Sequence, residues 1–430
     1  MINLFLNGGI RSWMCSDALD LTTIDGVPYC LEQKDNIKSL YSIMSGCELV
    51  GSMVAGLLMD YIGPQITAGF GIAMQVLAIV LYIMDSADTP TLAAGMVIGG
   101  LAINCVANPS FVLSWDFPNN ASLCASLTIA AQSLASGVLP VLGAVWGMTN
   151  MSFAGIWLSY MICIIPVGLL YIAALPSSTT KAMDEDPPKP SRIDVRAEED
   201  VELISPSPAP NNENTQPSRR RSSNAIDAFQ KADSVEDALN QMGEECHEAL
   251  QAIISPEYIV LNLINLGALV MVAFFNLNTD DLLGPKAARF VATWMPLQAV
   301  YALLWGAICD VTTTPPIMLL HFAAYALIYL LTLVTSPVVQ YLTANLFLMF
   351  LPFTYAMKYT QMIATWPSHI HGVLFGVCGA VSGSMAGILT LMSKMGHPTS
   401  LARILPFVSI AHFLPVAWLW MRSAKAAKVA

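Results

Sequence analysis

The sequence predicts an all-α membrane protein in which two pseudo-symmetric helical bundles are joined by a polar linker. Hydrophobic residues make up 55% of the 430 residues, charged residues make up 11%, and the mean hydropathy is +0.59. Soluble domains carry roughly 25% charged residues. Polar residues gather in one stretch, Pro176–Ser255, which separates two apolar blocks of similar length. Patterns in the first block recur in the second, so we expect two related bundles of six helices.

Eleven apolar stretches are long enough to cross a membrane, which takes about 20 helical residues. They predict an N-terminal bundle over residues 1–175, a linker over 176–255 and a C-terminal bundle over 256–430. The eleven are Ile37–Ile62, Ile66–Met84, Thr91–Leu113, Leu123–Trp146, Phe153–Leu175, Pro256–Leu277, Phe290–Val311, Ile317–Val334, Val339–Met362, Gly372–Met395 and Ala402–Met421.

The segment Met1–Trp13 is also apolar, but as a helix it would span only about 20 Å. We interpret it as the outer part of a first helix whose inner part is missing, which completes the first bundle. A short re-entrant or interfacial segment is the alternative. Cys15 and Cys30 lie in the polar loop that follows. They would form a disulfide if this loop faces the outside of the cell, and two free thiols are the alternative.

The linker holds most of the net charge. Between Lys181 and Ser255 there are 16 acidic and 8 basic residues, a net of −8 out of −11 for the chain. Basic residues favour the cytoplasmic side, and a cytoplasmic linker places 12 of the 19 Lys and Arg residues inside. We therefore expect a multi-pass protein of the plasma membrane, an internal membrane being the alternative. No basic stripe indicates nucleic-acid binding.

Two parts of the linker differ in composition. Residues 176–223 cannot bury apolar area, so we expect them to be disordered. Ser222 and Ser223 follow three arginines and are candidate phosphorylation sites, although short basic-serine runs are common in such segments. From Asn224 onward apolar residues recur at steps of three and four. This spacing predicts an amphipathic helix along the cytoplasmic surface.

One pattern occurs once in each half. Gly56 precedes Asp60 by four residues at a helix end, and Gly306 precedes Asp310 in the same way, 250 residues later. Glycine lets another helix approach closely, and a carboxylate at a helix end can reach the positive N-terminus of a neighbouring helix. A proline-containing helix start recurs at an offset of 249. Together the two repeats indicate an internal duplication.

The pattern Gly56-x-x-x-Asp60-x-x-Gly63 resembles the loop signature of the major facilitator superfamily, between its second and third helices. The two bundles and the long linker fit as well, so the resemblance covers nearly the whole chain. It implies a transporter that works by alternating access. The family usually has basic residues around this glycine, and their absence puts the usual charge relay of the closed state in doubt. This chain has Tyr61, Pro64 and Gln65 there.

Within the superfamily the chain is most similar to the facilitative system-L-type amino-acid transporters and their protozoan relatives. The similar segments are Phe274–Asn278, Phe117–Pro118 and Gly372–Gly376. This resemblance implies facilitative uptake or exchange of amino acids or a similar small polar metabolite. Two alternatives stay open: a non-transporting scaffold or sensor that keeps the fold, and a sugar or drug carrier.

Glu48 is the most informative single residue. It precedes Asp60 by twelve residues, which places it about 18 Å deeper along the helix, near the bilayer centre. A carboxyl group there is costly and indicates function, as a partner for a substrate amine or a proton carrier. A protonated, hydrogen-bonded glutamate is the alternative. The resemblance adds Asn104, Gln132 and Asn265, which lie on cavity-lining helices in relatives; bonds between helices are their alternative role.

The sequence shows no catalytic constellation. It has no P-loop for ATP, no nucleophile elbow and no metal-ligand spacing, so we expect neither an enzyme nor a cofactor. The expected partners are a small solute and the lipid bilayer. We expect Lys358, close to a helix end, to reach the membrane surface. Glu48 would then be nearly the only charge at mid-depth, which favours uniport or exchange over steep ion coupling.

Overall fold

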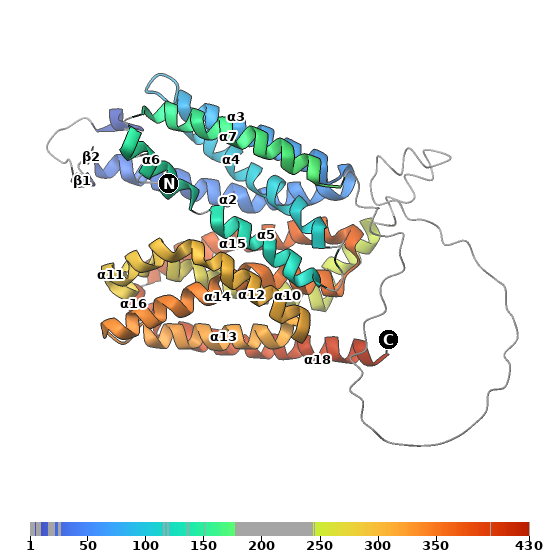
Figure 1. The fold of residues 1–430 in the computed structure, drawn as a ribbon. Coiled ribbons are helices and arrows are strands. Elements are labelled where there is room, and N and C mark those ends of the chain that lie inside the picture. Colours follow the sequence, from blue (N-terminus) through green and yellow to red (C-terminus); the bar gives the residue numbers. More distant parts are fainter. Residues whose placement is uncertain are drawn as a thin grey trace, which may run out of the picture.

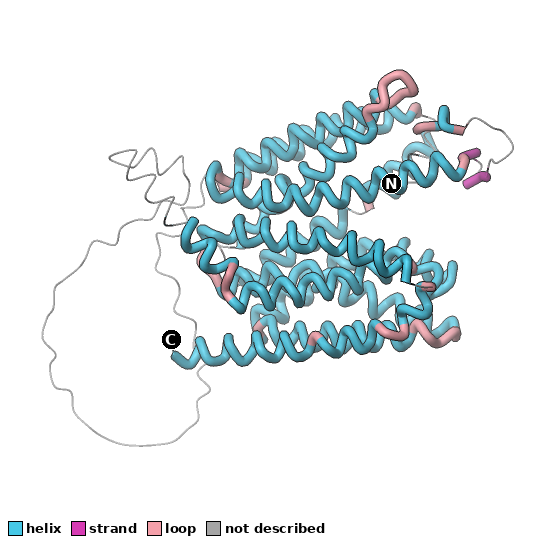
Figure 2. Tube along the Cα trace, turned by 180° about the vertical axis from the view of Figure 1, so that it is seen from behind, coloured by secondary structure: helices cyan, strands magenta, loops and turns pink. Residues whose placement is uncertain are grey.

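A computed structural model gives the fold (Figure 1) and describes residues 5, 10–15, 22–24, 27–114, 117, 120–135, 137–149, 151–176, 244, 246–395 and 397–429. These residues are almost all helical, as the tube in Figure 2 shows. The first half contains η1 (Ser12–Met14), β1 (Thr22–Ile24), β2 (Val27–Tyr29), α2 (Leu31–Ile62), α3 (Pro64–Met84), α4 (Leu92–Ala107), η3 (Asn108–Ser114), α5 (Ala121–Ala135), α6 (Val138–Thr149) and α7 (Phe153–Ala174).

The second half begins after the linker. It contains α10 (Pro256–Leu277), α11 (Thr279–Trp294), η6 (Met295–Leu297), α12 (Gln298–Thr312), α13 (Thr314–Leu331), α14 (Pro337–Thr365), η7 (Ser368–Ile370), α15 (His371–Met395), α16 (Pro398–Ala402), α17 (Leu405–Ala411) and α18 (Phe413–Val429). In Figure 1, α2, α3, α4 and α7 lie together on one side and α10 to α14 on the other. Helices α5 and α15 lie between these groups.

The predicted membrane stretches are helical in the part of the chain that the structure describes. Nine helical stretches there are long and apolar enough to cross a membrane, and Ala121–Ala135 and His371–Gly383 are shorter apolar helices. Four predicted helices are interrupted: three close to Pro109, Pro140 and Pro296, and Ala402–Met421 at residues 403–404 and 412. Proline lacks the amide hydrogen that the helical ladder needs, which explains why α5 and α6 replace one continuous helix.

Parts of the predicted outer and linker segments lie outside the described residues. Of Met1–Trp13, the structure describes Phe5, which is fully buried against the rings of Tyr82 and Trp157, and residues 10–13. Residues 177–243, with Ser222 and Ser223, are not described. The end of the predicted amphipathic helix is described. Residues 246–253 are helical and lead into α10, and Ala249 and Ala252 are buried.

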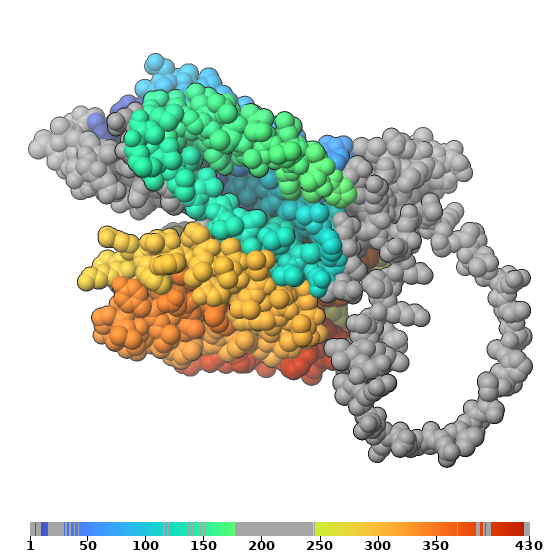
Figure 3. All heavy atoms as spheres, viewed as in Figure 1, coloured from blue at the N-terminus to red at the C-terminus, as the bar shows by residue number. Residues whose placement is uncertain are grey.

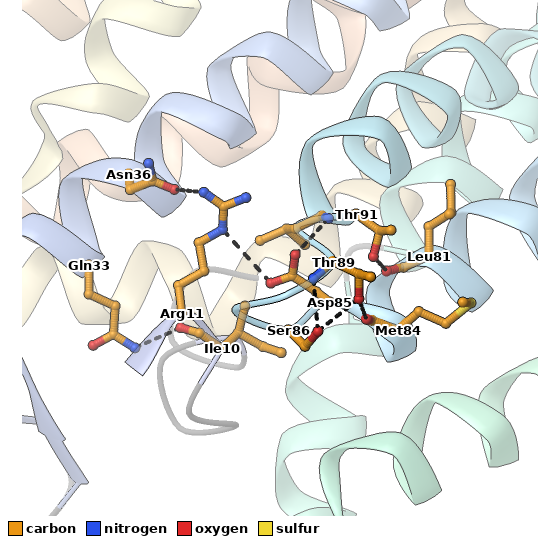
Figure 4. Close-up of polar contacts among 11 residues, drawn as sticks. Ile10, Arg11, Gln33, Asn36, Leu81, Met84, Asp85, Ser86, Thr89 and Thr91 are labelled. Carbon is orange, nitrogen blue, oxygen red and sulfur yellow. Dashed lines mark hydrogen bonds and ion pairs between the residues drawn. The ribbon is translucent and has the colours of Figure 1, made fainter. Parts of the chain in front are cut away.

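The two ends of the helical array are distinct. We call the end where α7 stops and α10 begins the linker end, and the opposite end the far end. Cys15 and Cys30 form a disulfide at the far end. Nearby, Arg11 Nη1 donates a 2.7 Å hydrogen bond to Asn36 on α2, and Arg11 Nε lies 3.8 Å from Asp85 after α3 (Figure 4). These contacts fasten the N-terminal segment to two helices.

The duplication is visible in the backbone at the linker end. Gly63, between α2 and α3, has φ 92° and ψ 161°, and Thr313, between α12 and α13, has φ 88° and ψ 154°. The two residues stand 250 positions apart, as Asp60 and Asp310 do. A left-handed conformation of this kind suits glycine and is rare for a β-branched residue. The same turn is therefore built twice, once with glycine and once with threonine.

Candidate functional site

A cavity of about 400 Å³ lies between helices of both halves. Its walls come from α2, α3, α4 and α5 on one side and from α10, α14 and α15 on the other. Ile129 and Gly379 both line it and are 250 residues apart, so the duplication extends to the cavity. The full lining is Glu48, Leu49, Ser52, Gln75, Ile103, Asn104, Ile129, Gln132, Ala135, Leu269, Tyr355, Lys358, Tyr359 and Gly379.

Helix α2 places Glu48 at the cavity through close packing with α4. Asn104 Nδ2 donates a 2.6 Å hydrogen bond to the backbone carbonyl of Glu48. A side chain at Gly100 would collide with the α2 backbone at Met44, and one at Gly51 would come within 2.8 Å of Leu101 Cα. Glycine on each helix therefore allows the approach that fixes Glu48 and Asn104 side by side.

Lys358 also lines the cavity, and the prediction that it reaches the membrane surface is wrong. Helix α14 continues to Thr365 and is packed against α5, α10, α11, α12, α13 and α15. The side chain therefore has no route outward, and Lys358 is only 9% exposed. Its Nζ lies 4.8 Å from the ring centroid of Tyr359, and it lines the same cavity as Glu48. The cavity lining thus holds two residues of opposite formal charge.

The structure brings together three of the four predicted binding residues. Glu48, Asn104 and Gln132 line the cavity. Asn265 does not: it is 1% exposed inside the second half, and its Nδ2 donates a 2.8 Å bond to Ser382 Oγ. Its position therefore joins α10 to α15. A polar group on an apolar helix gives no information about which neighbour it faces, so the sequence could not separate the two roles.

Several lining residues carried no strong sequence signal. Gln75 of α3 and Tyr355 of α14 face the cavity together with Lys358. A lysine seven residues inside a 29-residue apolar helix could have been recognised as an intramembrane charge. In the described residues, no group of three or more His, Cys, Asp or Glu side chains could hold a metal ion.

The cavity is closed at the linker end by two crossing pairs of helices. Helix α2 packs against α15, and α5 packs against α12; Figure 3 shows α5 lying against the second half. Glycines form the α2–α15 contact, where side chains at Gly56 and Gly376 would collide with the backbone of the opposite helix. Gly306 of α12 lies as closely against Ser126 of α5.

Carboxylates close each pair at its end. Asp60 accepts hydrogen bonds from the backbone N–H groups of Gly372 and Val373 at the start of α15, at 3.1 and 2.7 Å. Asp310 accepts from Ser122 and Leu123 at the start of α5, at 2.8 and 2.9 Å; these are the first turns of two helices. Both carboxylates thus meet positive helix N-termini.

Comparison with known proteins decides the family. The family model of the Major Facilitator Superfamily matches residues 32–423. The chain belongs to the major facilitator superfamily. The predicted fold class, an all-α membrane protein with this superfamily's architecture, is confirmed, and so is the predicted family. Members of this superfamily are membrane transporters, so the chain is a multi-pass membrane protein of a solute-transporter family.

Curated relatives agree with the predicted resemblance to protozoan amino-acid transporters. Cationic amino acid transporter 8 of Plasmodium berghei (strain Anka) is 22% identical over 412 residues, 91% of this chain and 80% of that protein. Arginine transporter 1 of Toxoplasma gondii is 26% identical over 165 residues, 38% of this chain and 31% of that protein. Aromatic and large neutral amino acid transporter 5-3 of Toxoplasma gondii is 23% identical over 200 residues, 45% and 39% of the two chains.

Solved structures share the fold at low sequence identity. The human organic anion transporter MFSD10 is 12% identical with a TM-score of 0.60, and the match covers 89% of this chain and 84% of that one. The proton:xylose symporter XylE is 10% identical with a TM-score of 0.59, covering 98% and 92%. At these identities the likeness concerns the fold alone.

Proposed function

We propose that this chain moves an amino acid across the membrane by alternating access, through facilitative uptake or exchange, and binds it in the cavity beside Glu48 and Lys358. The observation that carries the proposal is that one acidic and one basic side chain line the same cavity between the two halves. An amino acid brings the complementary pair of charges. About 400 Å³ lies within the range of about 300–1,000 Å³ typical of small-molecule sites.

The curated relatives support the same substrate class, since all three are named as amino-acid transporters. Their names include both cationic and neutral substrates. An uncharged sugar would leave two buried charges to be satisfied by each other alone, which makes a sugar carrier the weaker proposal. A non-transporting scaffold would need neither the cavity nor its charges.

The proposed movement uses residues 1–175 and 256–430 as two bundles joined by the linker 176–255. The structure is closed at the linker end, where Asp60 and Asp310 hold α15 and α5. Release towards that end requires these bonds to break while the far end closes. With the linker in the cytoplasm and the protein in the plasma membrane, this cycle carries substrate into or out of the cell.

Uptake of radiolabelled amino acids by proteoliposomes containing the purified full chain tests the proposal. We expect saturable uptake, reduced about tenfold or more in Glu48→Gln because a charged hydrogen-bond partner is lost. Glu32→Gln is the matched control, since Glu32 is exposed at the far end of the same helix. Absence of saturable uptake of any amino acid by the unmodified chain would overturn the proposal.

A further inference from the structure

The charge count of the cavity bears on which amino acids it can accept. Among the described residues that line it, Glu48 is the one acid and Lys358 is the one base. Their formal charges, one negative and one positive, sum to zero. A ligand with one positive and one negative group can place its positive group at Glu48 and its negative group at Lys358, so that no charge is left without a partner.

A cationic amino acid lacks a third partner here. Its side chain would add a positive charge, and the described lining offers no second carboxylate. Two further acids, Asp60 of α2 and Asp310 of α12, bind backbone N–H groups at the linker end. Burying an ionised group without a partner is strongly unfavourable, so the charge count disfavours such a ligand.

The remaining wall suits an apolar side chain. Leu49, Ile103, Ile129, Ala135 and Leu269 contribute aliphatic surface, and tyrosines of α14 contribute aromatic rings. Gly379 of α15 packs against Ser52 of α2, where an added side chain would collide with that serine. Moving an apolar side chain from water onto such a surface lowers the free energy.

We infer that the cavity selects zwitterionic amino acids with uncharged, apolar side chains over cationic ones. This inference rests on the proposed amino-acid transport. Glu48 receives the α-ammonium group, Lys358 receives the α-carboxylate, and the side chain lies against the aliphatic wall. Lys358 is therefore a specificity-determining residue, because it both binds the carboxylate and cancels the charge of Glu48.

The test compares leucine and phenylalanine with arginine and lysine, using the full chain in proteoliposomes at zero membrane potential. We expect uptake of the neutral pair to exceed that of the cationic pair about tenfold or more, because the extra charge is unpaired. Higher uptake of arginine or lysine would overturn the inference and leave the proposed function standing. Failure to take up any of the four, or any other amino acid, would overturn both.

Lys358→Met separates the two roles of the lysine. It leaves Glu48 unpaired, so we expect leucine uptake to fall and 3-methylbutylamine, which is leucine without its carboxylate, to compete better than leucine. Lys286→Met is the control, since Lys286 is exposed on α11. An unchanged order of competition in a folded Lys358→Met protein would contradict the role of Lys358. If that variant does not fold, the substrate comparison in the unmodified chain still decides the inference.

Discussion

Asp60 and Asp310 stand 250 residues apart and make the same interaction in the two halves of the protein. Each carboxylate ends a helix, α2 or α12, and accepts two backbone hydrogen bonds from the first turn of a helix from the other half. The acceptors and donors follow one offset, since Gly372 and Ser122 also differ by 250. The two contacts are therefore equivalent clamps on the closed linker end.

Removing one clamp should loosen only the helix that it holds. We expect Asp60→Ala to speed amide hydrogen exchange at the start of α15, and Asp310→Ala to do so at the start of α5, each by roughly tenfold for the loss of charge-assisted hydrogen bonds. Mass spectrometry of the two peptides measures this. Asp281→Ala, at an exposed far-end site, is the control. Equal exchange rates in the unmodified protein and all three variants would show that the carboxylates do not hold these helix starts.

The glycine beside the first clamp should tolerate no side chain. A methyl group at Gly56 would collide with the backbone of Gly372, whereas one at Gly46 on the same helix meets nothing within 4 Å. We expect Gly56→Ala to cost about 1–3 kcal/mol by overpacking and to lower the transport rate by preventing closure at the linker end. Thermal unfolding and initial uptake rates measure both effects, and Gly46→Ala should leave both unchanged. Equal behaviour of the two variants would refute the close contact.

Thr313 should be improved by glycine. Its φ of 88° and ψ of 154° lie in a region that costs a non-glycine residue about 1–3 kcal/mol. Thr313→Gly should therefore raise the free energy of unfolding by about 1 kcal/mol after the entropic cost of glycine. The reverse change at the equivalent turn, Gly63→Thr, should destabilise. Chemical denaturation in detergent measures both, and a destabilised Thr313→Gly protein would show that the turn is not strained.

The far-end cluster should respond to pH through Asp85. Burial raises the pKa of its carboxyl group, and the N–H of Leu92 and the nearby Arg11 partly offset the shift. A raised folded-state pKa means that the contribution to stability is full below the unfolded pKa of about 3.9 and is lost as pH rises through the folded value. The advantage in melting temperature of the unmodified protein over Asp85→Asn should therefore shrink from about pH 4 upward. If the difference in melting temperature instead grows as the pH rises, the pKa of Asp85 is lowered in the folded protein and the prediction is wrong.

The membrane helices and the repeat could be predicted from the residues alone. A chain that crosses lipid must satisfy its backbone hydrogen bonds internally, so apolar length alone marks the membrane helices. The break between α5 and α6 was not predicted, since Leu123–Trp146 was expected as one helix and prolines inside α7 and α14 cause no break. The offset of 250 between Gly56 and Gly306 was likewise visible in the printed residues. The same pattern, with its neighbour Asp60, was sufficient to indicate the family.

Which polar side chains share a site depends on how the helices pack in three dimensions. Lys358 was expected at the membrane surface and lies in the cavity, while Asn265 was expected in the cavity and joins α10 to α15. The direction of a side chain around its helix depends on which neighbours pack against that helix. These neighbours can be distant in the sequence, as α15 is from α2. The residues around a given position therefore do not indicate which helix its side chain will face.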